Sequence, residues 1–164
     1  MGQQQLLLLV LGIVIVGLAV VVGIQAFSEN QTKANADAQV NDAIRIASDA
    51  QAWALKPTAF GGGNGLFDGL GTNGLAKLGY ELGDNTSTPA TGAADQYENL
   101  NGIYEISQVT AGTAGSSTGS FTIVGCNDAL GTQVVMRVSG TTPADISTRI
   151  ITGVQGNCDF TLTS

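Results

Sequence analysis

A long stretch near the N-terminus restricts the folds open to this chain more than any other feature. Residues 6–27 form an apolar run of 22 residues that contains no Asp, Glu, Lys or Arg. At the rise of an α-helix, a run of that length spans about 33 Å, and the hydrocarbon core of a bilayer is about 30 Å thick. The run is therefore long enough to cross a membrane as a single helix.

The same helix is expected to continue well beyond the apolar run. After Phe27 no Gly or Pro occurs before Pro57, and helix-compatible residues such as Ala and Gln dominate. We therefore predict one helix over residues 3–55. A helix of roughly 80 Å is too long to be buried by the small domain that the remaining residues can form. Its apolar half must be surrounded by lipid or by copies of itself.

From Ser28 onward the expected helix is amphipathic. Apolar residues recur there at spacings of three and four, which places them along one side of a helix. The stripe consists of Ala36, Val40, Ala43, Ile44, Ala47, Ala50 and Ala54, and Ile46, Trp53 and Leu55 widen it. We expect this stripe to pack on the rest of the chain, chiefly in its last three turns, with Trp53 as a core anchor.

The rest of the chain has the composition of a loop-rich β domain, with 23 Gly in the whole sequence and only 12% charged residues. Short apolar runs separated by Gly, Ser and Thr turns predict an α+β fold. In it, the helix packs on one face of a small antiparallel sheet of about four strands, whose other face meets solvent. The expected strands are 103–109, 120–124, 132–138 and 159–163, and the assignment of 146–154 is left open.

These patterns divide the sequence into four parts. They are a hydrophobic half-helix over 1–28, an amphipathic half-helix over 29–56, a glycine-rich connecting loop over 57–101 and the antiparallel sheet with a C-terminal cysteine region over 102–164. The net charge is −7, and the six basic residues are scattered. Nucleic acid is not an expected partner, because phosphate binding needs clustered Lys and Arg.

Two cysteines, Cys126 and Cys158, lie beyond the apolar run. In an exported domain an even number of cysteines indicates a disulfide, whereas in a cytosolic domain the same two residues would be buried thiols. We favour the disulfide, which would link residues 32 positions apart.

Several short motifs match enzymatic patterns without the context those patterns need. Residues 69–74 fit G-x-G-x-x-G, but no strand precedes them in the expected structure, and loop chemistry explains the glycines better. Residues 115–119 fit G-x-S-x-G, a nucleophile motif that relies on a His base, and the chain contains no His. We expect neither enzymatic activity nor a cofactor.

Two kinds of surface site are also considered. Asp84, Asp95 and Glu98 could line a weak calcium site, although their spacing is not that of an EF-hand and solvated surface acids are the interpretation we favour. Asn30 and Asn85 begin glycosylation sequons, which matter only in an organism with the transferase.

This combination of features resembles the type IV pilin family. A helix with an apolar first half and an amphipathic second half, a glycine-rich loop, a small antiparallel sheet and a C-terminal cysteine pair match its architecture over the whole chain. The resemblance implies cleavage by a prepilin peptidase after Gly2, methylation of the new N-terminus at Gln3, and a disulfide between Cys126 and Cys158 that staples the C-terminal region. It also implies a filament with a core of bundled helices, with assembly positions at Leu6, Leu9, Ile13, Val16, Val20, Ile24 and Phe27.

The family also implies partners and a location. The chain would polymerise with itself into a helical homopolymer, with the help of the pilus assembly machinery. It would reside in the inner (cytoplasmic) membrane before assembly and afterwards in a filament, or fimbrium, on the cell surface. In this family a glutamate normally lies a few residues into the helix; here Gln3, Gln4 and Gln5 are the polar residues nearby, and a proline often found in the membrane segment is absent. A glutamine supplies a neutral hydrogen bond in place of an ion pair, which costs less to bury in hydrocarbon.

The family's leader is basic, and Met1-Gly2 is not. We therefore expect either a very short leader or a sequence that begins at its mature N-terminus. Two alternatives to a pilus subunit stay open, namely a pseudopilin of a secretion system and a single-pass anchored binding domain that does not polymerise. The uninterrupted amphipathic helix favours a polymer, because an anchor has no need of it.

Overall fold

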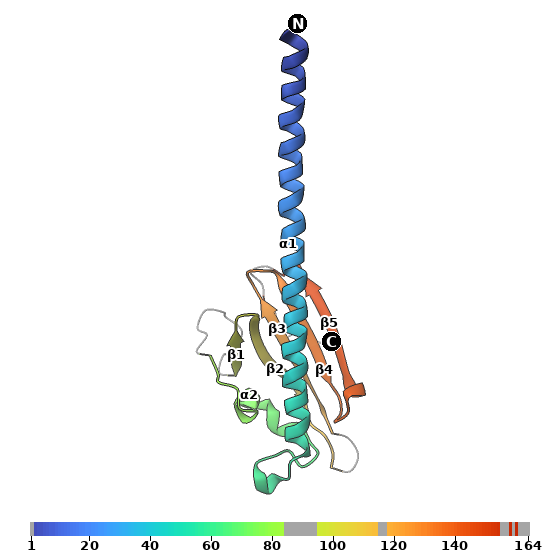
Figure 1. Cartoon of the computed structure of the whole chain (residues 1–164). Coiled ribbons are helices and arrows are strands. Elements are labelled where there is room, and N and C mark those ends of the chain that lie inside the picture. Colours follow the sequence, from blue (N-terminus) through green and yellow to red (C-terminus); the bar gives the residue numbers. More distant parts are fainter. Residues whose placement is uncertain (1, 84–94, 115–117, 155–157, 159, 161–164) are drawn as a thin grey trace. The chain divides into compact units, whose positions relative to one another are not determined.

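The computed structural model describes residues 2–83, 95–114, 118–154, 158 and 160 (Figure 1). The fold is α+β. Contacts divide the chain into two compact units, Met1–Ala34 and Asn35–Ser164, which we call unit 1 and unit 2. Helix α1 (Gly2–Leu55) supplies all the described residues of unit 1 and the first element of unit 2.

The end of helix α1 explains why the predicted helix stops where it does. The prediction of 3–55 is confirmed, and α1 begins one residue earlier, at Gly2. Pro57 has no backbone N–H to continue the helix, and the glycine-rich segment behind it folds back over the last turn. The N–H groups of Gly63 and Gly65 donate to the carbonyls of Trp53 and Ala54 over 3.1 and 2.6 Å. These bonds satisfy carbonyls that a helix end would otherwise leave open.

One face of α1 is buried in unit 2, and small residues form most of it. The buried residues are Ala36, Gln39, Ala43, Ile46, Ala47, Ala50, Gln51, Trp53 and Ala54. The expected anchor Trp53 is confirmed in the core, and its indole N–H donates to the Gly61 carbonyl over 2.9 Å. Two predictions are wrong, because Ile44 is 43% exposed and Leu55 is 64% exposed. Each is one residue beyond a buried alanine, a rotation of about 100° that takes it off the buried line.

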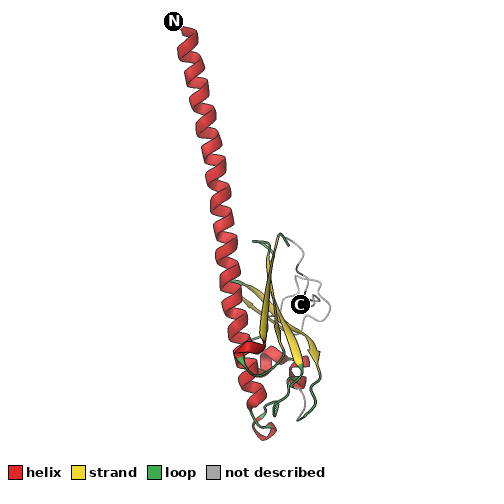
Figure 2. Ribbon diagram, turned by 90° about the vertical axis from the view of Figure 1, so that its right-hand side faces the viewer, coloured by secondary structure: helices red, strands yellow, loops and turns green. Residues whose placement is uncertain are grey.

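Five antiparallel strands form one sheet in the order β1-β2-β3-β4-β5, so each strand pairs with its sequence neighbour (Figure 1). Figure 2 shows this sheet on one side of the part of α1 that belongs to unit 2. The strands are β1 (Gln96–Asn99), β2 (Gly102–Thr110), β3 (Ser120–Asn127), β4 (Thr132–Val138) and β5 (Ile146–Thr152).

The sheet differs from the expected one at both edges. Strand β1 lies inside the segment expected to be a loop over 57–101, and β5 occupies the region left open at 146–154. The expected strand at 159–163 falls outside the described residues except for Phe160, which lies in a turn. Both missed strands are edge strands, β1 with four residues and β5 with mostly exposed side chains, so neither has the apolar pattern of a central strand.

The two faces of the sheet are both covered in part. The face toward α1 buries Tyr104, Ile106, Phe121, Ile123, Val134, Met136 and Val138. On the other face, Val124, Cys126 and Val135 form a second cluster with Phe160, which is 3% exposed. The expectation of a solvent-facing second face is therefore wrong at the centre of the sheet. Strand β3 is buried on both faces and gives the near-continuous apolar run that such strands require.

The described part of the connection between α1 and the sheet, residues 56–83, contains three short helical turns. These are η1 (Thr58–Phe60), η2 (Asp68–Gly71) and α2 (Gly74–Lys77). Phe67, Leu70 and Leu75 are fully buried in the core beside α1. A Cβ at Gly69 would lie 2.5 Å from the Trp53 ring, so this glycine is needed for close packing.

The tight fit of α1 on the sheet predicts a strong size dependence at Ala47. This residue is fully buried, whereas Ala52 on the same helix is exposed. We expect Ala47→Leu to lower the free energy of unfolding by about 1–3 kcal/mol, because an overpacked core forces its neighbours to shift. Ala52→Leu should change it by less than about 0.5 kcal/mol. Denaturant unfolding of the full chain in detergent, followed by Trp53 fluorescence, measures both; equal effects would contradict the packing described here.

Candidate functional site

Unit 1 presents an apolar surface that has no partner within its own chain. Its large apolar side chains, from Leu6 to Phe27, are all between 50% and 69% exposed. They occur at consecutive positions and so surround the helix on every side. By length and composition α1 is able to cross a membrane, and it is the one such helix in the described part of the chain.

The expected assembly positions all lie on this surface. Their exposed fractions are Leu6 67%, Leu9 63%, Ile13 65%, Val16 63%, Val20 55%, Ile24 65% and Phe27 65%. Other apolar residues are equally exposed, for example Leu7 at 69% and Leu18 at 63%. The isolated chain therefore does not single out one contact stripe, and any partner can approach from any direction.

Three glycines interrupt the apolar surface of unit 1. A Cβ added at Gly12, Gly17 or Gly23 would meet no atom within 4 Å. These glycines are therefore not required by packing inside the chain. At the helix start, Gly2 is the first residue of α1, and Gln3 is exposed beside it.

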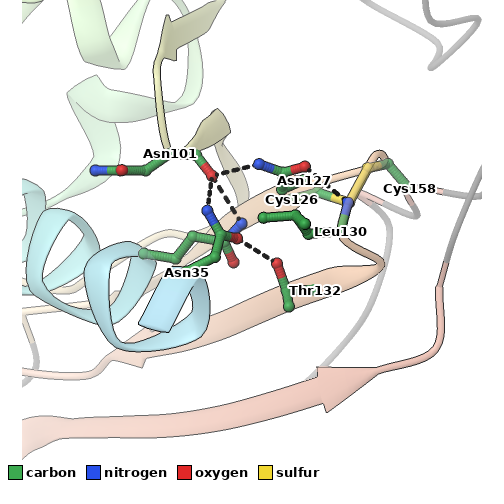
Figure 3. The surroundings of a disulfide bond; sticks show 8 residues. Asn35, Asn101, Cys126, Asn127, Leu130, Thr132 and Cys158 are labelled. Carbon is green, nitrogen blue, oxygen red and sulfur yellow. Dashed lines mark hydrogen bonds between the residues drawn. A yellow bond between two sulfur atoms is a disulfide. The ribbon is translucent and has the colours of Figure 1, made fainter. Parts of the chain in front are cut away.

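Within unit 2, a cluster of amide side chains fixes α1 to the sheet (Figure 3). The backbone carbonyl of Asn101 accepts hydrogen bonds from Asn35, Gln39 and Asn127 at 3.0, 3.1 and 3.0 Å. The Thr132 hydroxyl donates to the Asn35 side-chain oxygen over 2.6 Å. One carbonyl in the turn between β1 and β2 thus joins the helix, the β1–β2 turn and the end of β3.

Asp42 extends this cluster by one helical turn. Its Oδ2 accepts hydrogen bonds from the side chains of Asn99, Asn101 and Tyr104 at 2.9, 2.8 and 3.0 Å. Burial alone would raise the pKa of Asp42, but the bonds from Asn101, Asn99 and Tyr104, with a smaller effect of Arg45, lower it below 3.8. Asp42 therefore stays ionised and acts as a fixed acceptor at neutral pH.

Beside Asp42, the rings of three tyrosines lie in a row and are tilted relative to one another. The ring centroids of Tyr80 and Tyr97 are 4.9 Å apart, and those of Tyr97 and Tyr104 are 6.1 Å apart. The Tyr80 hydroxyl donates to Asp49 over 2.6 Å. Burial, together with the adjacent carboxylates, raises the pKa of both Tyr80 and Tyr104, so both hydroxyls remain donors.

Cys126 and Cys158 form the disulfide, with Cα atoms 5.9 Å apart. Cys126 is buried at the end of β3, beside the amide cluster in Figure 3, and Cys158 is half-buried. The bond holds the chain at Cys158 against the second face of the sheet, where Phe160 covers Val124 and Val135.

The other sequence candidates are not brought together. Asp95 accepts the Gly74 N–H over 2.7 Å, Glu98 is exposed on β1, and Asp84 lies outside the described residues. Of the sequons, Asn30 is exposed on α1 and Asn85 lies outside the described residues. Residues 69–74 run from η2 through a turn to the start of α2, and Gly69 and Gly74 pack on Trp53 and Ile106. Of the G-x-S-x-G segment, 115–117 are likewise not described.

Sequence reasoning missed the polar residues that hold the helix in place. Gln39 and Gln51 lie within the buried stripe, at helical spacing from Ala43 and Ala47. Gln51 donates to the carbonyls of Gly140 and Thr142 at 2.9 and 3.0 Å. Their position in line with the alanines was the available signal, since a glutamine there must find partners when the stripe is buried.

The fold and the exposed helix together define a class, an α+β domain attached to a helix that is apolar and uncharged over residues 6–27 and is able to cross a membrane. Comparisons with known protein families, curated proteins and solved structures find no match to this chain.

Removing the Asp42 carboxylate should destabilise unit 2 in a pH-dependent way. We expect Asp42→Ala to cost about 1–3 kcal/mol at neutral pH, because three donors lose their acceptor. The folded-state pKa is lowered, so the carboxylate contributes stability above the unfolded pKa and loses it as the pH falls. The difference from wild type should shrink below about pH 4. Asp37→Ala, at an exposed position on the same helix, is the control; unfolding curves that differ equally at pH 7 and pH 3 would refute this role.

The disulfide should contribute more than any single side chain at the second face. We expect the double variant Cys126→Ala/Cys158→Ala to lose about 2–5 kcal/mol, because the cross-link restricts the unfolded chain. The variant should also bind a hydrophobic dye as Val124 and Val135 become accessible. Reductant should shift the thermal unfolding of wild type toward that of the variant and leave the variant unchanged. A wild type insensitive to reductant in its unfolding would contradict the prediction.

Proposed function

We propose that this chain is a structural, non-enzymatic subunit of an extracellular type IV pilus-like filament. One observation carries the proposal. Twenty-two uncharged residues are exposed on all sides of unit 1, and the same helix continues without a break into the buried core of unit 2. An apolar surface of that size needs a covering, which lipid supplies before assembly and other copies supply in a filament.

The helix supports polymerisation more than simple anchoring. A membrane anchor needs only a segment that spans the bilayer, and a flexible linker serves to attach a domain to it. Here no Gly or Pro occurs between Gly23 and Pro57, so a single helix joins the apolar surface to the sheet. Copies that pack through the same helices in a contact that does not close on itself form a helical polymer.

The neutral start of the helix is compatible with burial in such a bundle. Gln3, Gln4 and Gln5 offer amide donors and acceptors and bring no charge into the apolar region. A neutral polar group costs far less to bury than an unpaired carboxylate. Under this proposal a peptidase cleaves after Gly2, and the new N-terminus at Gln3 enters the filament core.

The proposal is tested by shearing cells that produce the chain, sedimenting the released material and examining it by electron microscopy and mass spectrometry. We expect thin filaments with this chain as the dominant protein, and an N-terminal peptide whose mass reports cleavage after Gly2 and methylation of Gln3. If the chain stays in the membrane fraction and no filament contains it, the proposal fails and a membrane-anchored domain replaces it.

A pair of variants separates helix packing from membrane insertion. Gly17→Leu keeps unit 1 apolar but fills a position where the isolated chain has no neighbouring atom, so insertion should persist while filament yield falls several-fold. Ile13→Leu conserves volume at another exposed position and serves as the control. The measurement is the amount of chain in the sheared pellet relative to that in the membrane. Equal yields from the two variants would show that Gly17 is not at a close helix contact.

A further inference from the structure

One carboxylate lies directly beside the disulfide bond. An oxygen of Asp128 and the sulfur atoms of Cys126 and Cys158 all lie within 4.8 Å of one another. Such a group of atoms holds a metal ion only when the cysteines are thiolates, and here the two sulfurs are bonded to each other. The carboxylate therefore lies next to a closed disulfide, and it acts on that bond through its charge.

Hydrogen bonds hold the turn that carries this carboxylate. Asp128 is the first residue after β3, in the turn that leads to β4. The side-chain oxygen of Asn127 accepts the Leu130 N–H over 3.1 Å (Figure 3). On the other side of the turn, the Gly131 carbonyl accepts the Gly153 N–H over 2.8 Å. These bonds fix the backbone of the turn and keep the carboxylate near the two sulfurs.

No ion pair cancels the charge of Asp128. Its side chain is exposed, and within the described part of the chain it has neither a hydrogen-bond partner nor an ion-pair partner. The sequence around the disulfide is also poor in positive charge, because residues 123–136 and 150–164 contain no Lys or Arg. The disulfide therefore lies in the field of a negative charge.

The two sulfurs differ in their access to solvent. Cys126 is 0% exposed, whereas Cys158 is half-buried. A thiolate reduces a disulfide by attacking one of its sulfurs, and access helps to decide which sulfur is attacked. The attack is therefore expected at Cys158. The electron pair of the broken bond then moves to Cys126, which leaves as a thiolate in a buried position.

The charges that take part in this step are close to Asp128. The attacking thiolate brings a negative charge to Cys158, and a negative charge develops on Cys126 as it leaves. Both sulfurs lie within 4.8 Å of the carboxylate oxygen, and like charges repel. Burial disfavours the Cys126 thiolate further. The closed disulfide carries no charge, so the carboxylate raises the energy of the attack without a comparable effect on the starting state.

We propose that Asp128 protects the disulfide between Cys126 and Cys158 against reduction by anionic thiols. The carboxylate forms no bond to the reductant and acts only by its charge and position. This role concerns unit 2 of a single copy, so it does not depend on the proposed filament. It assigns a use to a side chain that makes no hydrogen bond or ion pair within the described fold.

The reduction consists of two thiol–disulfide exchange steps. In the first, a thiolate forms a bond to the Cys158 sulfur, the bond between Cys126 and Cys158 breaks, and Cys126 takes the electron pair and then a proton. In the second, another thiolate attacks the mixed disulfide and releases Cys158 as a thiolate. The protein disulfide is thereby reduced, and two monothiols are oxidised to their own disulfide. Asp128 opposes the first step, in which the closed bond is opened.

Reduction kinetics of the full chain in a neutral detergent test this role. Wild type and Asp128→Asn are treated with excess glutathione, which is anionic, or excess cysteamine, whose ammonium group balances its thiolate charge. A maleimide traps the free thiols at intervals, and mass spectrometry counts them. We expect glutathione to reduce Asp128→Asn about three- to tenfold faster than wild type, and cysteamine to show a clearly smaller increase. In about 1 M salt the difference with glutathione should shrink, because the charges are screened.

Two further variants are the matched controls. Asp128→Glu keeps the charge and should be reduced about as slowly as wild type. Asp68→Asn removes one carboxylate charge at the other end of β3, where Asp68 accepts the Gly112 N–H near Ser120. Along the strand, Ser120 and Cys126 are roughly 20 Å apart. Asp68→Asn should therefore leave the rate of reduction unchanged.

The use of two thiols separates a charge effect from a loss of stability. A variant that only unfolds more readily would be reduced faster by both thiols and by the same factor. Equal factors with glutathione and cysteamine, or a rate with glutathione equal to that of wild type, would overturn the proposal. An equal acceleration in Asp68→Asn would also overturn it, because net charge would then explain the result. None of these outcomes bears on the proposed filament.

Discussion

The close approach of helix α1 to the sheet determines how the rest of unit 2 is built. Ala43, Ala47, Ala50 and Ala54 are fully buried, so the helix backbone lies near the strands and the volume of the core is filled from the sheet side. Tyr104, Phe121 and Met136 supply that volume. Gly125 makes room for Tyr104, since a Cβ there would lie 2.7 Å from its ring. The small residues on the helix face and the large residues on the sheet face are complementary in volume. A change of side-chain size on one face therefore requires a compensating change on the other.

Apolar packing of this kind does not by itself fix the position of the helix along the sheet, because alanines repeat every turn. The hydrogen bonds of buried polar side chains fix that position. Gln39 reaches the Asn101 carbonyl, and Gln51, three turns later, reaches the carbonyls of Gly140 and Thr142. A shift of α1 by one turn would leave both glutamines buried without these partners, at a cost of about 1–3 kcal/mol for each unsatisfied group. The buried glutamines thus set the register that the alanines leave open. In the proposed filament, the same bonds would resist a pull along the helix axis.

Helical periodicity and short apolar runs in the sequence predicted the long helix and the central strands. The bounds of α1, the core position of Trp53 and the central strands β2, β3 and β4 all follow from apolar patterns that the structure confirms. The errors occur where burial depends on a distant segment. Ile44 and Leu55 have the hydrophobicity of core residues, but the sheet does not reach them, and the cover over Val124 comes from Phe160, 36 positions away. The hydrogen bonds of Asp42 and Asn101 could not be predicted from the sequence either, because no periodic pattern marks the turn residue that a helix side chain contacts.

The two halves of α1 place different demands on sequence, and this difference bears on how the chain recognises its partners. In unit 2 each buried position meets a particular side chain of the sheet, so residue size and hydrogen bonding are specified one position at a time. In the apolar run of unit 1, residues 6–27, most positions are large aliphatic residues, and nothing in the isolated chain distinguishes one side of the run from another. Such a surface is covered well by lipid or by like helices, but it carries little information about direction or register. Specific order in an assembly must then come from features that are not repeated along the helix. Gly12, Gly17 and Gly23 of unit 1 are features of this kind that the structure provides.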